Sequence, residues 1–195
     1  MCAEGNMTVA YPSTPASYFH LLRRQAYARP RRPLIVFTPK SMLRLKAASS
    51  APEDFTTRGF EPVMADRDDA TSGDVTRVLI AAGKVVYDLL AAREERGDTS
   101  TAILRLEQYY PLPAADLAEQ LAKYPNAEVV IVQDEPKNQG AWPFLALNLP
   151  EALEALGEHR VPAVVCRPAS ASPATGSTKK HQIEQADLIA RAFDR

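Results

Sequence analysis

The sequence is poor in the residues that build metal centres and disulfide frameworks. It holds two cysteines and three histidines in 195 residues. Cys2 and Cys166 lie far apart without paired spacing, so we expect both thiols to be free, as in a reducing, cytoplasmic setting. None of His20, His159 and His181 has ligand spacing to another His, Cys, Asp or Glu, so no metal site is predicted.

Long hydrophobic runs and an excess of one charge are also absent. No apolar stretch approaches the ~20 residues that a membrane-spanning helix needs. The 23 basic and 24 acidic side chains give a net charge of -1, so nothing favours binding to nucleic acid or to an anionic membrane. The remaining composition is that of an ordinary globular protein, and we predict a single domain over residues 1–195.

Glycine is scarce, with eight glycines against 16 prolines. The sequence contains no Gly-rich phosphate loop, no dinucleotide fingerprint and no nucleophile elbow, which excludes the common signatures of those enzymes. Gly83 and Lys84 follow a predicted strand, but the segment is too short to cradle a phosphate. We interpret Gly83 as the residue that allows a tight strand-to-helix turn.

Apolar runs alternate with segments of helical periodicity through most of the chain. We predict strands at residues 34–37, 77–80, 102–106, 129–132 and 161–166, and helices at 15–29, 86–96, 114–123 and 179–193, with a short helix opening near 139–142. Unbroken apolar runs are typical of parallel strands buried on both faces. The pattern therefore predicts an α/β fold, a three-layer sandwich with a mostly parallel sheet of about five strands.

Residues 47–74 interrupt this alternation. They are polar, have few branched apolar side chains and show no strong periodicity. We predict a surface excursion here, with a small edge element near residues 60–64.

A basic segment, residues 37–44, follows the first predicted strand. Ligands collect at the carboxyl ends of strands in open α/β sheets. Lys40, Ser41 and Arg44 could bind a phosphate there, or they could form an ordinary solvated turn, and both interpretations stay open. Arg24 belongs to a second basic run, on the first predicted helix, where arginine suits planar recognition of a carboxylate or phosphate.

Two further stretches carry clustered polar or small residues. Residues 132–142 combine amides, carboxylates and the single tryptophan, and they suit either a site or a capped helix start. Residues 167–173 are small enough for close approach to a neighbour, or for a flexible loop.

The same stretches carry a family resemblance. The segments STPASYFHLLRRQ, RPLIVFTPKSMLR, GKVVYDLL, RLEQYYPLP, VQDEPKNQGAWPF and RPASASPATGS resemble, in order and spacing, the C-terminal region of 2-oxoglutarate dehydrogenase, decarboxylating component. The resemblance covers about residues 2–193 and is strongest to the actinobacterial multifunctional type.

The resemblance implies a transketolase-type C-terminal domain. The parent enzyme of the family is an oxidoreductase of the tricarboxylic acid cycle that decarboxylates 2-oxoglutarate with thiamine diphosphate and Mg²⁺. It passes the succinyl unit to the lipoyl group of an acyltransferase component. The family's Gly-Asp-Gly cofactor motif and its Gly-Pro-Glu-His-Ser-Ser-Ala-Arg segment are not in this sequence. We therefore expect a fragment whose cofactors are bound by other domains, which begins artificially at Met1 and is inactive alone.

The resemblance also implies a regulatory and dimer-interface role. In the family this domain covers the interface of a homodimer, and it responds to acetyl-CoA or AMP. The positions of this sequence that match the effector site are Thr8, Arg24, Lys40, Ser41, Arg44 and Arg93. We expect Thr8 to end the first strand and these side chains to converge on one sheet edge, although the basic histidine that commonly follows Arg44 is replaced by Leu45.

Such a domain should expose an apolar face that a partner covers. Trp142, Phe144 and the loop at residues 168–173 are the predicted contacts, since aromatic and small residues suit close packing. An alternative function is a free-standing module that binds acyl-CoA or adenine nucleotides, and a third possibility is a non-functional gene remnant.

Overall fold

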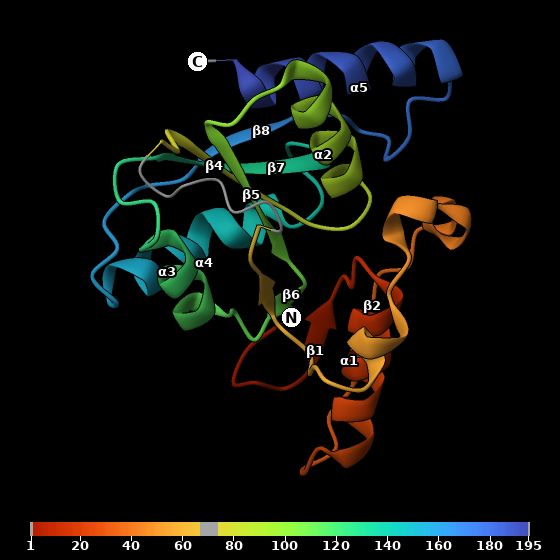
Figure 1. Cartoon of the computed structure of the whole chain (residues 1–195), viewed down its shortest axis with the longest axis vertical. Coiled ribbons are helices and arrows are strands. Elements are labelled where there is room, and N and C mark those ends of the chain that lie inside the picture. The colour runs from red at the N-terminus through yellow and green to blue at the C-terminus, as the bar shows by residue number, and fades with distance from the viewer. Residues whose placement is uncertain (1, 67–73, 195) are drawn as a thin grey trace.

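Two sheets organise the chain in the computed structural model, which describes residues 2–66 and 74–194. The strands are β1 (Thr8–Ala10), β2 (Leu34–Val36), β3 (Val63–Met64), β4 (Arg77–Ala81), β5 (Thr101–Leu106), β6 (Gln108–Tyr110), β7 (Glu128–Pro136) and β8 (Ala163–Arg167). The α-helices are α1 (Pro15–Tyr27), α2 (Val85–Arg96), α3 (Ala114–Leu121), α4 (Trp142–Glu154) and α5 (Thr178–Phe193). Figure 1 shows the larger sheet between helices and the smaller sheet beside α1.

The larger sheet confirms the predicted three-layer α/β fold. Its strand order is β3-β5-β4-β7-β8, with every pair parallel except β3 and β5. Val78 and Ile80 of β4 pack into one buried cluster with α3 and α4, whereas Leu79 and Ala81 pack into another with α2 and α5. Because alternate side chains of a strand point to opposite faces, the continuous apolar run fills both clusters.

The smaller sheet was not predicted. Its order is β2-β1-β6, with β1 parallel to β2 and antiparallel to β6. The prediction that the strand at residues 34–37 is fully buried is wrong, because β2 lies at the edge of this sheet and Ile35 is 46% exposed. Glu107 alone separates β5 from β6, so the chain passes directly from one sheet to the other.

Helix α1 connects the two parallel strands of the smaller sheet. Its start is capped: the Thr14 side chain accepts a hydrogen bond from the Ser17 backbone N–H, and Pro15 occupies the first turn. The helix ends at Tyr27, two residues before the predicted boundary near Arg29.

The excursion predicted at residues 47–74 contains more regular structure than expected. The edge element is confirmed as β3, and a short 3-10 helix occupies Pro52–Phe55 (η3). Two further 3-10 helices, Lys40–Arg44 (η1) and Lys46–Ala48 (η2), lead into the excursion. Residues 67–73 of this prediction lie outside the described residues. Within the part of the chain that is described, no helix is long and apolar enough to cross a membrane.

Candidate functional site

The predicted anion-binding residues are divided between two ends of the smaller sheet. Thr8 begins β1 and pairs with Leu34 at the start of β2, so the prediction that it ends its strand is wrong. Lys40, Ser41 and Arg44 form η1, which follows the end of β2. Because β1 and β2 are parallel, Thr8 lies at the opposite strand end from η1, and these four residues do not share one edge of the sheet.

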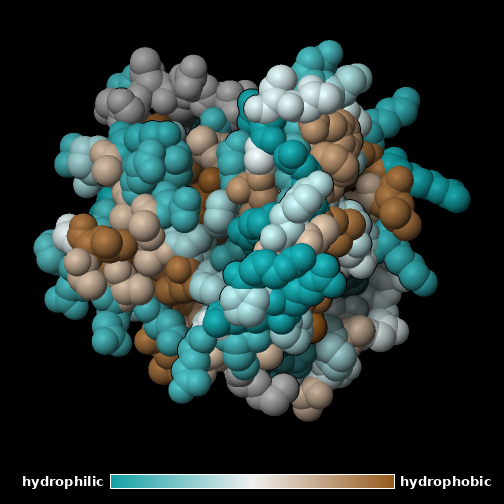
Figure 2. Space-filling model, turned by 90° about the horizontal axis from the view of Figure 1, so that it is seen from below, coloured by the Kyte–Doolittle hydropathy of each residue, from teal (hydrophilic) through white to brown (hydrophobic). Residues whose placement is uncertain are grey.

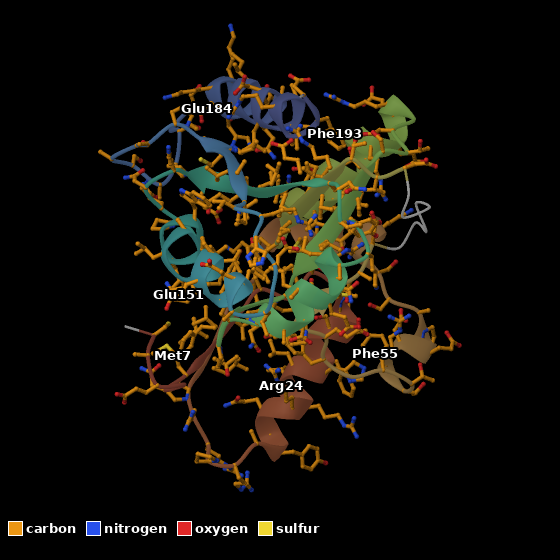
Figure 3. All side chains as sticks on the ribbon, turned by 90° about the vertical axis from the view of Figure 1, so that its left-hand side faces the viewer. Met7, Arg24, Phe55, Glu151, Glu184 and Phe193 are labelled. Atoms are coloured by element: carbon orange, nitrogen blue, oxygen red, sulfur yellow. The ribbon has the colours of Figure 1, made fainter. Side chains whose placement is uncertain are left out.

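Arg24 is held in place on α1 by two neighbours. Its Nη2 donates a hydrogen bond to Oε1 of Gln108 over 2.6 Å, and its guanidinium carbon lies 4.3 Å from the centre of the Phe60 ring. Partial burial lowers the pKa of this guanidinium from its ordinary value. Figure 3 shows Arg24 toward one end of the molecule, with Glu184 and Phe193 of α5 at the other end. A stacked and hydrogen-bonded arginine of this kind is pre-organised to hold an anion.

Arg93 lies apart from the other predicted residues. It belongs to α2 and forms a two-pronged ion pair with Asp66, in which Nη2 donates to Oδ1 over 3.1 Å and Nη1 donates to Oδ2. Its side chain is 6% exposed and that of Asp66 1%. Nη1 also donates to the Thr101 carbonyl, so the guanidinium is used inside the domain.

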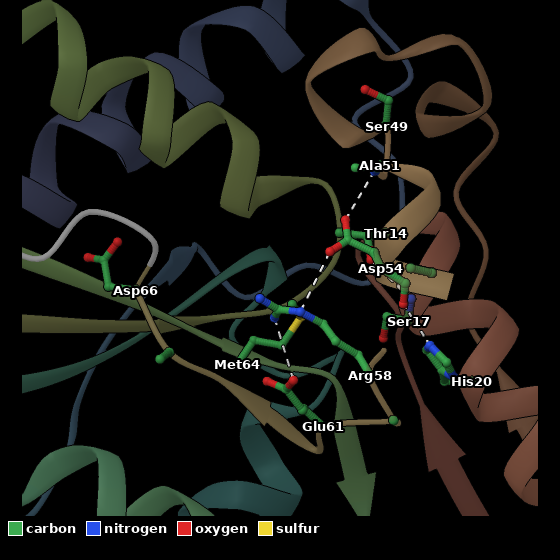
Figure 4. Close-up of a pocket in the computed structure, with 13 residues that line it drawn as sticks. Thr14, Ser17, His20, Ser49, Ala51, Asp54, Arg58, Glu61, Met64 and Asp66 are labelled. Carbon is green, nitrogen blue, oxygen red and sulfur yellow. Dashed lines mark hydrogen bonds and ion pairs between the residues drawn. The ribbon is translucent and has the colours of Figure 1, made fainter. Parts of the chain in front are cut away.

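A polar cavity of about 590 Å³ lies between α1, the η3 segment and β3 (Figure 4). His20 in its wall places Nε2 2.8 Å from the Asp54 carbonyl oxygen. Arg58 lies 3.6 Å from both Asp54 and Glu61, which joins the acidic groups of the wall to a cation. The cavity therefore offers hydrogen-bonding groups of mixed charge rather than a concentrated charge of one sign.

A buried carboxylate ties α1 to the larger sheet. Oε2 of Glu107 accepts hydrogen bonds from the Ser13 backbone N–H over 2.7 Å and from the Ser17 hydroxyl over 2.6 Å. Its Oε1 is buried without a hydrogen-bond partner among the described residues. Burial, as the largest cause, raises the pKa of this carboxyl despite the two serines and Arg105, which lower it. Nothing in the sequence pattern singled out this residue.

Ligands of α/β sheets usually bind at the carboxyl ends of the strands, and in this sheet the Tyr11 side chain occupies that position. The order β5-β4-β7 places the reversal of the sheet between β4 and β7. The Tyr11 ring lies there, 2.1 Å from where a Cβ on Gly83 would be, so only glycine fits. Burial, followed by the charges of Asp134 and Glu135, raises the pKa of Tyr11 to about 12.

The two polar stretches at residues 132–142 and 167–173 lie against each other. Gln133 accepts a hydrogen bond from the Trp142 backbone N–H and donates to the Pro136 and Gln139 carbonyls, which fixes the start of α4. Asn138 exchanges two hydrogen bonds of 3.0 Å with the backbone of Ser170. These contacts favour the interpretation of residues 132–142 as a capped helix start.

Trp142 and Phe144, two of the predicted partner contacts, are half-buried and pack against the core of their own domain. The third, the loop at residues 168–173, is largely exposed. Cys166 is buried in β8, and burial raises the pKa of its thiol, which makes it a poor nucleophile.

The described residues do not fit the magnesium ion of the resembled family. Within residues 2–66 and 74–194, no group of three or more His, Cys, Asp or Glu side chains could hold a metal ion. No catalytic step through that group follows from this chain.

Comparison with known proteins identifies two matching families. The model of the 2-oxoglutarate dehydrogenase C-terminal family matches residues 49–193, and that of the transketolase pyrimidine-binding domain matches residues 1–46.

The chain is 50% identical, over its whole length, to the 2-oxoglutarate dehydrogenase E1/E2 component of Corynebacterium glutamicum, of which it covers 16%. It is 49% identical to the multifunctional 2-oxoglutarate metabolism enzyme of Mycobacterium sp. (strain KMS), with 98% of this chain and 15% of that protein covered. It is 46% identical to the 2-oxoglutarate dehydrogenase E1 component of Cupriavidus necator, with 99% and 20% covered. The chain thus spans a fifth or less of the length of these relatives.

Proposed function

The chain belongs to the 2-oxoglutarate dehydrogenase C-terminal family, and we propose that it works as the C-terminal unit of such an enzyme. In this proposal the parent enzyme decarboxylates 2-oxoglutarate with thiamine diphosphate and Mg²⁺ held by other domains. It then passes the succinyl unit to a lipoyl-bearing acyltransferase component. The observation that carries the proposal is that the family model and the relatives, which match over the whole chain, both point to 2-oxoglutarate dehydrogenase. Free cysteines suit the cytoplasmic location that we also propose.

Exposed apolar side chains of residues 1–46, together called the apolar face here, support a role beside other domains. Leu22 of α1 and Ile35 of β2 are each 46% exposed, and Leu43 of η1 is 84% exposed. Figure 2, which views the molecule from the end where α1 lies, shows groups of hydrophobic side chains between hydrophilic ones. All three residues fall in the segment that matches a pyrimidine-binding domain. We propose that further residues of that domain cover this face, and that the parent enzyme is a homodimer.

Hydrogen bonds join the two segments that match different family models, residues 1–46 and residues 49–193. Glu107 accepts two hydrogen bonds from the start of α1, and the Tyr87 hydroxyl donates to the Ser13 carbonyl over 2.6 Å. Strand β6 completes the sheet of β1 and β2. Because each segment satisfies buried polar groups of the other, we propose that the described residues of the two segments move together as a rigid body.

An association experiment tests the proposed place of the chain. The Corynebacterium glutamicum relative, produced without its counterpart of this chain, is mixed with the purified chain and analysed by sedimentation. We expect a complex that Leu22→Asp and Ile35→Asp weaken, because each places a charge in the apolar face. Ile183→Asp is the matched control, since Ile183 is 61% exposed on α5, away from this face. Absence of a complex, or equal weakening by Ile183→Asp, contradicts the proposal.

The regulatory part of the proposal is an anionic effector, acetyl-CoA or AMP. The Arg24 guanidinium is stacked over the Phe60 ring, and η1 carries two cationic side chains, Lys40 and Arg44, as well as the Ser41 hydroxyl. We propose that these residues receive the phosphates and that Thr8, at the other strand end, contacts another part of the effector. Arg93 lies apart from them, and we propose that it supports the site indirectly, by holding Asp66 in place through their ion pair.

Calorimetric titration of the chain with acetyl-CoA, and with AMP for comparison, tests this site. We expect Lys40→Ala to weaken binding about tenfold, the equivalent of about 1.4 kcal/mol for one lost phosphate contact. Lys179→Ala, on the exposed first turn of α5, is the control. Binding that is unchanged by Lys40→Ala contradicts the site. Saturable binding by a chain that forms no complex with its relative favours the alternative function, a free-standing module for acyl-CoA or adenine nucleotides.

A further inference from the structure

A second cavity, of about 470 Å³, has walls of a different chemistry. It lies between the smaller sheet and the start of α4, and aromatic rings from both parts line it. The centres of the Tyr11 and Phe37 rings are 5.7 Å apart, and each lies 6.4 Å from the centre of the Tyr109 ring. The Tyr110 and Phe144 rings also line the cavity, with their centres 6.1 Å apart. Such rings present negative faces that attract a cation.

One charged side chain, Glu135, lies among the described residues that line this cavity. Space for its carboxylate depends on Gly140, since a Cβ at that position would lie 3.1 Å from Oε2 of Glu135. Within the described residues, no Lys, Arg or His nitrogen forms a salt bridge with Glu135. Asp134 precedes it and adds a second negative charge nearby.

We propose that this cavity binds an alkylammonium group, which its aromatic rings surround and the Glu135 carboxylate neutralises. The two features act on the same ligand. Aromatic faces alone would accept a neutral aliphatic group, but the carboxylate would then remain partly desolvated without an ion-pair partner, since the charge of Arg167 offsets it only weakly. An anion would be repelled by Glu135 and Asp134. An alkylammonium ion satisfies both the rings and the carboxylate.

Two sources could supply this chemistry, and they are tested in parallel on the whole 195-residue chain. Choline represents a free small cation, and Nα-acetyl-lysine methylamide represents a lysine side chain of a protein. The neutral control is 3,3-dimethyl-1-butanol, which has the shape of choline without its charge. Binding is followed by NMR shifts of the tyrosine ring signals, because three tyrosines, Tyr11, Tyr109 and Tyr110, line the cavity.

We expect saturable shifts with one cation or both, and at least tenfold weaker binding of the neutral alcohol. Glu135→Gln should weaken cation binding about tenfold, and Phe37→Leu should weaken it with the carboxylate intact. Glu151→Gln, on the exposed side of α4, should leave binding unchanged. The proposal is overturned if the alcohol binds as well as choline, if neither cation gives a saturable shift, or if both cavity variants bind normally.

Discussion

Replacement of Glu107 by alanine tests how the two sheets are joined. The carboxylate is fully buried and accepts hydrogen bonds from the Ser13 backbone N–H and the Ser17 hydroxyl. Alanine leaves both donors buried near the start of α1, and each unsatisfied donor costs about 1–3 kcal/mol. The two losses predict a decrease of about 2–6 kcal/mol in the free energy of unfolding. Urea denaturation, followed by circular dichroism, measures this change.

The pH dependence of the same residue gives a second, independent readout. Burial in the folded chain raises the pKa of Glu107 above its ordinary value of 4.5. The folded chain therefore binds the carboxyl proton of Glu107 more tightly than the unfolded chain does. Its contribution to stability is full below the unfolded pKa and is lost as the pH rises through the folded pKa. Glu107→Gln cannot titrate. The stability of the wild-type chain relative to this variant should therefore fall above about pH 4, by up to about 1.4 kcal/mol per pH unit.

Either of two results would refute the reasoning. An alanine variant that unfolds within about 0.5 kcal/mol of the wild type would show that the two hydrogen bonds add little. A wild-type chain whose stability rises with pH relative to Glu107→Gln would show that the carboxylate is favoured, rather than disfavoured, in the folded chain.

Two other substitutions test packing elsewhere in the fold by the same denaturation assay. Gly83→Ala should destabilise the chain by more than about 2 kcal/mol, because a Cβ would overlap the Tyr11 ring. Gly97→Ala shares the positive φ but has no neighbour within 4 Å of the added Cβ, so it should cost about 1 kcal/mol. Equal effects of the two substitutions would contradict the packing argument. Arg93→Leu should cost about 3–5 kcal/mol because the buried Asp66 carboxylate loses its two-pronged ion pair, and a change below about 1 kcal/mol would contradict this.

Local signals in the sequence predicted most helices and strands. Pro15 and the preceding Thr14 specify the start of α1, and Gly97, with φ +60°, ends α2 directly after the predicted helix at residues 86–96. The burial of β2 was mispredicted because an apolar run such as Leu34–Val36 does not reveal whether a neighbouring strand or helix covers it. The exposure of that strand depends on contacts between distant segments.

The candidate sites were less predictable than the fold. Lys40, Ser41 and Arg44 follow a strand, as expected, since that depends on local order. The separation of Thr8 from them depends on strand direction, which no spacing reveals. The aromatic cavity combines Tyr11 with Tyr109, almost 100 residues apart in sequence, so periodicity could not indicate it.

Activity of a chimeric enzyme tests the central claim most directly. In this chimera, the present chain replaces its counterpart in the Corynebacterium glutamicum relative, with which it shares 50% identity. We predict that the chimera oxidatively decarboxylates 2-oxoglutarate in the presence of thiamine diphosphate and Mg²⁺, whereas the separate 195-residue chain shows no turnover under the same conditions. A chimera that folds and dimerises without turnover, or turnover by the separate chain, would contradict the assignment of this chain as a C-terminal unit.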